Sequence, residues 1–269
     1  MWQKTGFRIV VKVGTSTLTH DSGAMNLQSM EHLIRVLSDL GGCGHEIILV
    51  SSGAIAVGTD KLSLPERPKE LRMKQAAAAV GQCRMMHIYD KLFSEYNRSV
   101  AQILLTDEDV ENPVRAEHLS NTFSALLEMG VIPVVNENDS VSSAEIETGH
   151  QKIFGDNDTL SAIVAKLCNA DLLILLSDIN GLYDMDPHTN PDAHLIHRVE
   201  ELKPEILEMA GGAGSWRGTG GMATKLSAAK IAMESGCDMV ITNGARMEDL
   251  YDIVSGKDVG TRFVAEKNA

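Results

Sequence analysis

The chain has 269 residues, a formal net charge of -13 at pH 7 and an isoelectric point near 5.1. This length can bury a substantial core, as one large α/β domain or two small ones. The acidic balance argues against nucleic acid or an anionic membrane surface as a partner, because binding phosphate groups in series requires a basic face. With no apolar leader and no run of roughly twenty apolar residues, we expect a cytoplasmic protein.

The four cysteines lie far apart in the sequence, at Cys43, Cys83, Cys168 and Cys237. They form no C-x-x-C pair and show no Cys/His spacing of a zinc site. We therefore expect reduced, buried thiols. His188, His194 and His197 fall in or just after a turn-rich stretch, which favours a solvated loop over a metal site.

Six apolar runs of strand length recur along the chain with helical segments between them. They cover residues 7–13, 46–51, 100–105, 131–136, 172–177 and 239–242. Apolar strands that alternate with helices indicate a parallel sheet covered on both faces. We therefore predict an α/β fold in three layers, with a central, mostly parallel sheet and helices on both sides.

The expected helices follow capping and propensity signals. Asn26 can cap a helix whose apolar stripe starts at Leu27 and which ends at Gly41-Gly42. Further helices are expected over 70–93, 116–129, 160–167 and 224–235. The linker-like stretches 61–68, 184–193 and 211–221 are too short or too internal to mark a boundary, so we expect one domain spanning 1–269.

Polar residues follow nearly every expected strand, at the edge where ligands gather in open α/β sheets. The first strand leads into Lys12 and the turn Gly14-Thr15-Ser16, which could cradle an anion, although this motif alone favours an ordinary turn after a surface lysine. The second leads into Ser51-Ser52-Gly53, which suits either a substrate oxyanion or a helix cap. Both interpretations of each motif stay open at this point.

Two polar clusters lie further along the chain. Asn136-Glu137-Asn138-Asp139-Ser140 suits hydrogen bonding to the ammonium and carboxylate of an amino acid, which we favour over an Asx-rich turn. Gly155-Asp156-Asn157-Asp158-Thr159 opens a helix, but a cap explains only one of these polar residues. The others suit the orientation of catalytic lysines or the binding of a metal-nucleotide.

The strongest local pattern is the glycine loop 218–225, which opens onto the last long helix and ends in Lys225. Its N–H groups and Lys225 would face one anion. With Asp238 it also matches a dinucleotide fingerprint superficially, but Asp238 precedes the strand 239–242 instead of following it. The P-loop and protein-kinase motifs are missing, so another kind of phosphate-binding loop is predicted.

Taken together, these motifs resemble the amino-acid-kinase family. The matching stretches are 11–16, 51–58, 80–82, 102–106, 136–139, 155–158 and 218–225, in order over almost the whole chain. Each is unspecific alone, but the combination is highly specific. The Gly-Thr-Ser turn after Lys12 differs from the Gly-Gly of aspartokinases and acetylglutamate kinases, and the chain looks like the members that act on L-glutamate.

The resemblance implies transfer of the ATP γ-phosphoryl group to the side-chain carboxylate of L-glutamate, the first step of proline biosynthesis. Mg²⁺ would accompany the nucleotide, with no metal ligand assigned to the protein. By match to the family motifs, Lys12 and Lys225 would neutralise the phosphoryl group, and Asp158 would hold these lysines. Ser52, Asp139 and Asn157 would bind glutamate. ATP would contact Lys12, Ser177, Asp178, Thr219, Gly220, Gly221, Met222, Ala223, Thr224 and Lys225.

The resemblance also implies an organisation. Glutamate would bind mainly in the N-terminal part and ATP in the C-terminal part of a short form that lacks the C-terminal PUA domain. The segment 147–154, somewhat longer than in some relatives, would border the glutamate site. A homodimer or homotetramer, feedback inhibition by proline and coupling to glutamyl phosphate reductase are family expectations. The alternatives are a kinase of this fold with another acceptor, a non-catalytic amino-acid sensor and, last, an oxidoreductase.

Overall fold

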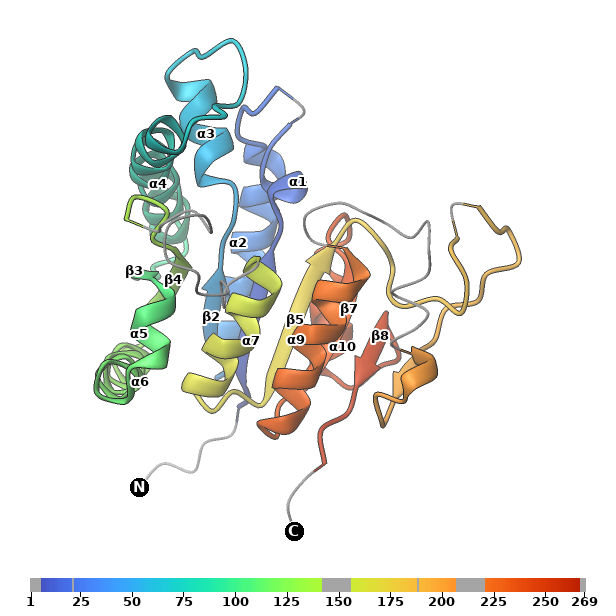
Figure 1. The fold of residues 1–269 in the computed structure, drawn as a ribbon. Helices are drawn as coiled ribbons and strands as arrows, with labels where there is room; N and C mark the ends of the chain where they lie inside the picture. The colour runs from blue at the N-terminus through green and yellow to red at the C-terminus, as the bar shows by residue number, and fades with distance from the viewer. Residues whose placement is uncertain (1–5, 21, 142–155, 188, 207–220, 267–269) are drawn as a thin grey trace.

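The computed structural model describes residues 6–20, 22–141, 156–187, 189–206 and 221–266. At its centre is an eight-stranded sheet in the order β3-β4-β2-β1-β5-β7-β8-β6 (Figure 1). The strands are β1 Arg8–Val13, β2 Glu46–Val50, β3 Val100–Leu105, β4 Ile132–Glu137, β5 Leu172–Ser177, β6 Arg198–Val199, β7 Asp238–Asn243 and β8 Thr261–Phe263. Neighbouring strands are parallel except β7 and β8, which are antiparallel. The predicted fold class is confirmed.

All six predicted strands are present, and β6 and β8 are two additions. These additions have two and three residues and include an exposed or half-exposed arginine, so neither makes an apolar run in the sequence. The helices are α1 Thr15–Leu18, α2 Leu27–Gly42, α3 Ala54–Lys61, α4 Leu71–Ser94, α5 Asp107–Glu111, α6 Pro113–Glu128, α7 Asn157–Leu167, α9 Met222–Glu234 and α10 Asp249–Val254. Of these, α1, α3, α5 and α10 were not predicted.

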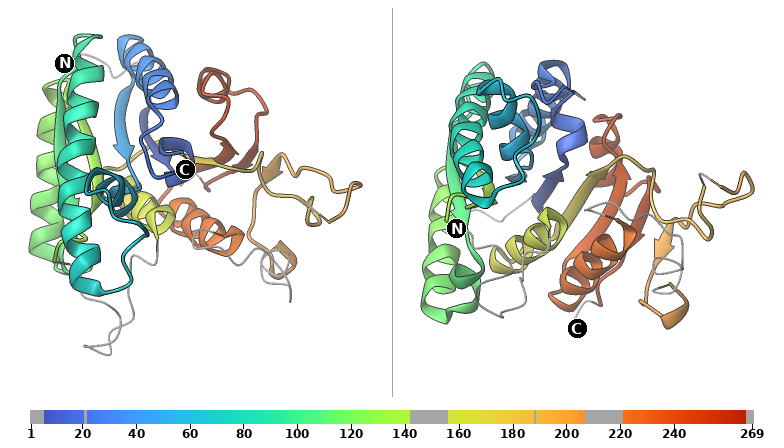
Figure 2. Two further views of the ribbon diagram at one scale, coloured as in Figure 1. Left: turned by 90° about the horizontal axis from the view of Figure 1, so that it is seen from above. Right: turned by 45° about the horizontal axis from the view of Figure 1, so that its top comes forward.

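The two faces of the sheet carry separate hydrophobic clusters. Side chains of a strand alternate between its faces, so Ile9 and Val11 of β1 pack with α2, α4 and α10, whereas Val10 packs with α6, α7 and α9. The view from above in Figure 2 shows α2 on one side of the sheet and α7 and α9 on the other. This is the predicted three-layer sandwich.

Two glycines bring α3 and α4 into direct contact. A Cβ atom on Gly58 would lie 1.8 Å from the carbonyl oxygen of Ala77, and one on Gly81 would lie 1.8 Å from that of Ala54. No real Cβ atom approaches backbone that closely, so only glycine permits this crossing. The contact fixes where α3 begins, at the carboxyl end of β2.

At the central strand β1 the strand order of the sheet reverses direction, so the sheet extends from β1 to both sides. Its parallel neighbours are β2 on one side and β5 on the other. Ligands of open α/β sheets bind at such a switch point, outside the carboxyl ends of the strands. The segments after β1, β2, β4 and β5 therefore meet at one edge.

The cysteines are only partly as predicted. Cys168 and Cys237 are buried, and burial raises the pKa of each thiol to about 12. Cys43 and Cys83 are exposed, so the prediction of buried thiols was wrong for them. Cys43 caps the end of α2, and Cys83 lies on the outward face of α4.

Among the described residues, no helix is long and apolar enough to cross a membrane.

Candidate active site

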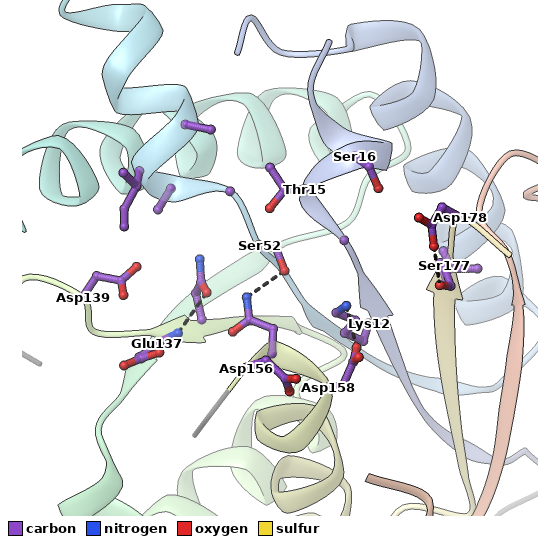
Figure 3. A pocket seen from close by; sticks show the side chains of 18 of the residues that line it. Lys12, Thr15, Ser16, Ser52, Glu137, Asp139, Asp156, Asp158, Ser177 and Asp178 are labelled. Atoms are coloured by element: carbon purple, nitrogen blue, oxygen red, sulfur yellow. Dashed lines mark hydrogen bonds and ion pairs between the residues drawn. The ribbon is translucent and has the colours of Figure 1, made fainter. Parts of the chain in front are cut away.

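A cavity of about 490 Å³ opens at the carboxyl edge of the sheet. Its lining comes from the segments that follow β1, β2, β4 and β5 and from the first turns of α3, α7 and α9. Figure 3 shows Lys12 and Asp158 facing each other below Thr15 and Ser16. In the same view Glu137 and Asp139 lie on one side of this pair, and Ser177 and Asp178 lie on the other.

Asp158 joins two lysines at the floor of the cavity. One carboxylate oxygen lies 2.6 Å from Nζ of Lys12 at the end of β1, and the other lies 3.1 Å from Nζ of Lys225 on α9. The hydroxyl of Thr224 donates a further hydrogen bond of 3.3 Å to the same carboxylate. Asp158 is fully buried in the first turn of α7, so the structure brings together all three residues that the sequence singles out here.

The charge state of Asp158 follows from its surroundings. Burial alone would raise the pKa of this carboxyl group, because it disfavours the charged form. The charges of Lys12 and Lys225 and their hydrogen bonds outweigh burial and hold the pKa below its ordinary value. Asp158 is therefore ionised at neutral pH and leaves the cluster of one carboxylate and two ammonium groups with one net positive charge.

Asn157 connects the start of α7 to the end of β2. Its side-chain amide donates to the backbone oxygen of Ser51 at 3.0 Å and to the hydroxyl of Ser52 at 2.7 Å. The Ser51 hydroxyl is in turn hydrogen-bonded to the buried Tyr89 of α4 at 2.8 Å, and burial raises the pKa of that phenol. Two of the three predicted substrate-binding residues thus hold each other in place.

The third predicted substrate residue, Asp139, lies on the wall formed after β4, with Asn136 and Glu137 beside it. Asn136 is 4% exposed, and its side-chain oxygen accepts a hydrogen bond from the backbone N–H of Glu137. Its amide nitrogen has no partner within the described stretches. A buried donor that lines a cavity and lacks a partner is a donor available to a ligand.

The start of α3 forms the roof of this part of the cavity. Gly53 has φ +93°, a conformation that side chains rarely adopt, and it turns the chain sharply from β2 into the helix. As a result Ala54, Ile55 and Ala56 of the first turn line the cavity. Their N–H groups have no acceptor earlier in the helix, so they favour an anion there.

On the other side of the lysine pair lie Ser177 and Asp178, with the serine hydroxyl donating to the aspartate at 3.0 Å. Of the predicted glycine loop, Thr219 and Gly220 lie outside the described residues. Gly221 caps α9, which begins at Met222, two residues earlier than predicted. Lys225 lines the cavity, whereas the predicted ATP-binding residues Gly221, Met222, Ala223 and Thr224 are not among its lining residues. The segment 147–154 also lies outside the described residues.

Two weaker motifs of the sequence, the dinucleotide pattern with Asp238 and the possible metal-binding histidines, are not part of this site. Asp238 opens β7 and lies opposite the edge that carries the cavity, where it pairs with Arg262 at 3.2 Å. The acid that would hold a ribose belongs at the other end of the strand, so the dinucleotide pattern has no structural counterpart. Among the residues that the structure describes, no group of three or more His, Cys, Asp or Glu side chains is placed to hold a metal ion.

Sequence reasoning missed one charged residue of the cavity. Arg67 lines it from the loop between α3 and α4, a stretch that looked like a linker. The signal that could have found it is the pair of prolines, Pro65 and Pro68, which stiffen the chain around a single cation.

Paired ammonium groups held by a buried carboxylate, beside free helix N–H groups, can stabilise the charge of a transferring phosphoryl group. The site is thus suited to phosphotransfer. The model of the amino acid kinase family matches residues 7–243, and the chain belongs to this family.

Similar proteins agree with the assignment. The chain is 57% identical over 264 residues to a glutamate 5-kinase of Clostridium perfringens, covering 98% of this chain and 97% of that protein. It is 56% identical to a glutamate 5-kinase of Clostridium tetani, covering 96% and 95% of the two chains. Among solved structures, carbamate kinase from Giardia lamblia bound to AMP-PNP superposes with a TM-score of 0.66 at 15% identity, covering 98% of this chain and all of that one, which shows the shared fold.

Proposed function

We propose that the protein transfers the γ-phosphoryl group of ATP to the side-chain carboxylate of L-glutamate, giving L-glutamyl 5-phosphate, the first step of proline biosynthesis. The bridging of Lys12 and Lys225 by the buried Asp158 carries this proposal. A carboxylate acceptor is already a nucleophile, so the enzyme has to position it and neutralise charge. The identity to glutamate 5-kinases over nearly the whole chain supports glutamate as the acceptor.

The nucleotide occupies the side of the cavity that carries Ser177 and Asp178, with the loop of Thr219, Gly220, Gly221, Met222, Ala223, Thr224 and Lys225 around its phosphates. Free N–H groups at the start of α9 suit an anion. Lys12 and Lys225 contact the transferring phosphoryl group, and Asp158 keeps them in place. Mg²⁺, which arrives with the nucleotide, would neutralise charge on the ATP phosphates. Carboxylates that line the cavity, such as that of Asp178, have the oxygen atoms that Mg²⁺ prefers as ligands.

Glutamate occupies the other side, mainly on the N-terminal part of the chain, whereas ATP is bound mainly by the C-terminal part of the same domain. Ser52, Asn157 and Asp139 surround it there. The carboxylate of Asp139 is a partner for the α-ammonium group, and the hydroxyl and amide of the Ser52–Asn157 pair are partners for carboxylate oxygens. This arrangement leaves the side-chain carboxylate of glutamate facing the two lysines.

The proposal is tested by ADP release from Mg-ATP with L-glutamate, D-glutamate, aspartate, N-acetylglutamate and UMP, with hydroxylamine present to trap an acyl phosphate. Turnover and hydroxamate formation with L-glutamate alone, lost in Lys225→Ala, are expected. Lys230→Ala on the outward side of α9 is the matched control and keeps full activity, because its side chain is exposed and forms an ion pair with Glu234, away from the cavity.

The same assay decides between this proposal and its rivals. Turnover with UMP or another acceptor alone would keep the phosphotransfer site and reject glutamate. Tight glutamate binding without any ATP turnover would indicate a sensing module instead.

The family resemblance also leads us to expect feedback inhibition by proline, a dimeric or tetrameric assembly and coupling to glutamyl phosphate reductase. A proline titration without effect on activity up to high concentration would contradict the expected feedback inhibition.

A further inference from the structure

Arg67 is a cation of the cavity that the proposed mechanism leaves without a role. It lies in the loop between α3 and α4, is exposed and lines the cavity. Its neighbour Lys69 pairs with Glu66 at 3.7 Å, but the Arg67 guanidinium group makes no ion pair within the described parts of the chain. Its position between Pro65 and Pro68 restricts the loop and favours an extended backbone at Arg67.

The charges that line the cavity indicate what the Arg67 guanidinium group could bind. The other cations among its described lining residues, Lys12 and Lys225, both contact Asp158. The lining acids are Glu137, Asp139, Asp156, Asp158 and Asp178. An acceptor with two carboxylates therefore enters a cavity whose acids outnumber its cations. Its second carboxylate, which does not react, needs a positive partner away from the lysine pair.

Arg67 joins the cavity lining from the loop between α3 and α4. Its loop joins α3 to α4, and α3 starts directly after the Ser52–Gly53 turn. In both views of Figure 2, α4 (teal) and α9 (orange) lie on opposite sides of α7 (yellow). Since α9 carries Lys225 and α7 carries Asp158, α4 lies across α7 from the helix of Lys225, at the end of the cavity that we assign to the acceptor.

Two further donors lie at this end. The first-turn N–H groups of α3 line the cavity without helical acceptors, and the buried amide nitrogen of Asn136 has no partner in the described residues. A planar guanidinium group binds a carboxylate with two parallel hydrogen bonds, which an ammonium group cannot do. Together these donors form a set for one carboxylate that is separate from the lysine pair.

We propose that Arg67 binds the α-carboxylate of the amino-acid acceptor and thereby selects acceptors that carry a charged group at this position. The inference rests on the proposed function, because it assumes an amino acid with a second, reacting carboxylate. Arg67 is a specificity residue in this scheme and does not touch the transferring phosphoryl group. Its loss weakens binding of the acceptor and leaves the chemical step intact.

The test compares Arg67→Met with Lys69→Met, which removes the same charge from the same loop at a position that does not line the cavity. In Arg67→Met the KM for L-glutamate rises roughly 10- to 100-fold, the usual range for a lost hydrogen bond to a charged group, while kcat and the KM for ATP stay within about twofold. Arg67→Lys recovers part of the loss, and Lys69→Met behaves as wild type.

A second acceptor identifies the contacted group. L-Glutamate α-amide keeps the reacting carboxylate and the α-ammonium group but has a neutral amide in place of the α-carboxylate. The wild-type preference for L-glutamate over this amide, measured as a ratio of kcat/KM, falls at least about tenfold in Arg67→Met. An unchanged KM for glutamate, or a rise in the KM for ATP instead, would overturn the inference. A wild-type enzyme without turnover of L-glutamate would refute the proposed function itself.

Discussion

Asp158 is the residue on which the chemistry of this site depends most. It is fully buried, yet ionised, because two ammonium groups compensate for its lost hydration. The same contacts fix the positions of Lys12 and Lys225, which otherwise repel each other. One carboxylate thus sets both the geometry and the net charge of the cavity floor, where we propose that the phosphoryl group binds.

Replacing Asp158 by asparagine is expected to lower kcat at least about 100-fold, because the two lysines lose their common anchor. The free energy of unfolding falls by roughly 3–5 kcal/mol at pH 7, the cost of removing one partner from a buried ion pair. The lowered pKa of Asp158 means that its contribution is complete above the unfolded-state pKa of about 3.9 and is lost as the pH falls through the folded-state value.

Urea unfolding at several pH values checks this expectation. The difference in stability between wild type and Asp158→Asn should be constant from pH 7 down to about pH 5 and then narrow in more acidic solution. Asp60→Asn, at an exposed position of α3, is the control and should follow wild type throughout. A difference that persists unchanged into acid would show that the ionised carboxylate is not its origin.

The four thiols should fall into two classes of reactivity. The thiolate is the reactive form, and burial raises the pKa of Cys168 and Cys237 to about 12, so neither reacts in the folded protein near pH 8. Cys43 and Cys83 are exposed and should be alkylated quickly. Peptide mass spectrometry after brief alkylation, with and without denaturant, measures this, and rapid labelling of Cys168 in the folded protein would contradict the structure.

At the scale of elements, the pair α3 and α4 shapes the side of the cavity that we propose for the acceptor. The start of α3, Tyr89 beneath the Ser51–Ser52 turn and the loop that carries Arg67 all belong to this pair. The crossing depends on Gly58 and Gly81, where no side chain fits. A change at the crossing therefore acts on the site without touching any residue of its lining.

Gly58→Ala and Gly81→Ala are each expected to destabilise the protein by roughly 1–3 kcal/mol, as overpacking of a core does, and to raise the KM for L-glutamate more than that for ATP. The matched control is Gly41→Ala in α2, where a Cβ atom would lie 3.5 Å from Arg98, an ordinary contact. Thermal unfolding and steady-state kinetics measure both effects. Equal rises in the two KM values would argue against a separate acceptor side.

On the scale of the whole molecule, the cavity draws its residues from both halves of the sheet. Lys12 comes from the central strand, Ser52 and Asp139 from segments on one side of it, and Ser177 and Lys225 from segments on the other. A ligand that spans the cavity therefore contacts both halves. Ligand binding should stabilise the fold as a unit, since it favours the native state over the unfolded chain.

Mg-ATP at about 100 times its dissociation constant is expected to add roughly 2.7 kcal/mol to the free energy of unfolding and to raise the melting temperature by several degrees. Excess EDTA should remove most of this stabilisation and all turnover, and added Mg²⁺ should restore both. Lys12→Met should show a smaller shift than wild type, whereas Lys166→Met, near the end of α7, should show the full one. A full shift in EDTA would mean that the nucleotide binds without the metal.

The sequence by itself determined the layers of the fold and the edge at which the site lies. Apolar runs of strand length specify the six long strands, because strands of a parallel sheet that is covered by helices are mostly apolar. Short elements escaped prediction: β8 has three residues, and α3 has eight and follows a turn residue with positive φ. Their existence depends on packing against other elements, β7 for β8 and α4 for α3, and not on their own sequence alone.

The tertiary structure alone decided which polar residues meet. Nothing local pairs Lys225 with Asp158, 67 residues away, or Asn157 with Ser52, 105 residues away; the parallel strand order brings them to one edge. The entry of Arg67 into the cavity has the same origin, whereas the bridging role of Asp158 was expected from the family resemblance and not from local sequence. Local sequence records the propensity of each segment, whereas a site of this kind is made by contacts between segments, and these form only when the sheet is assembled.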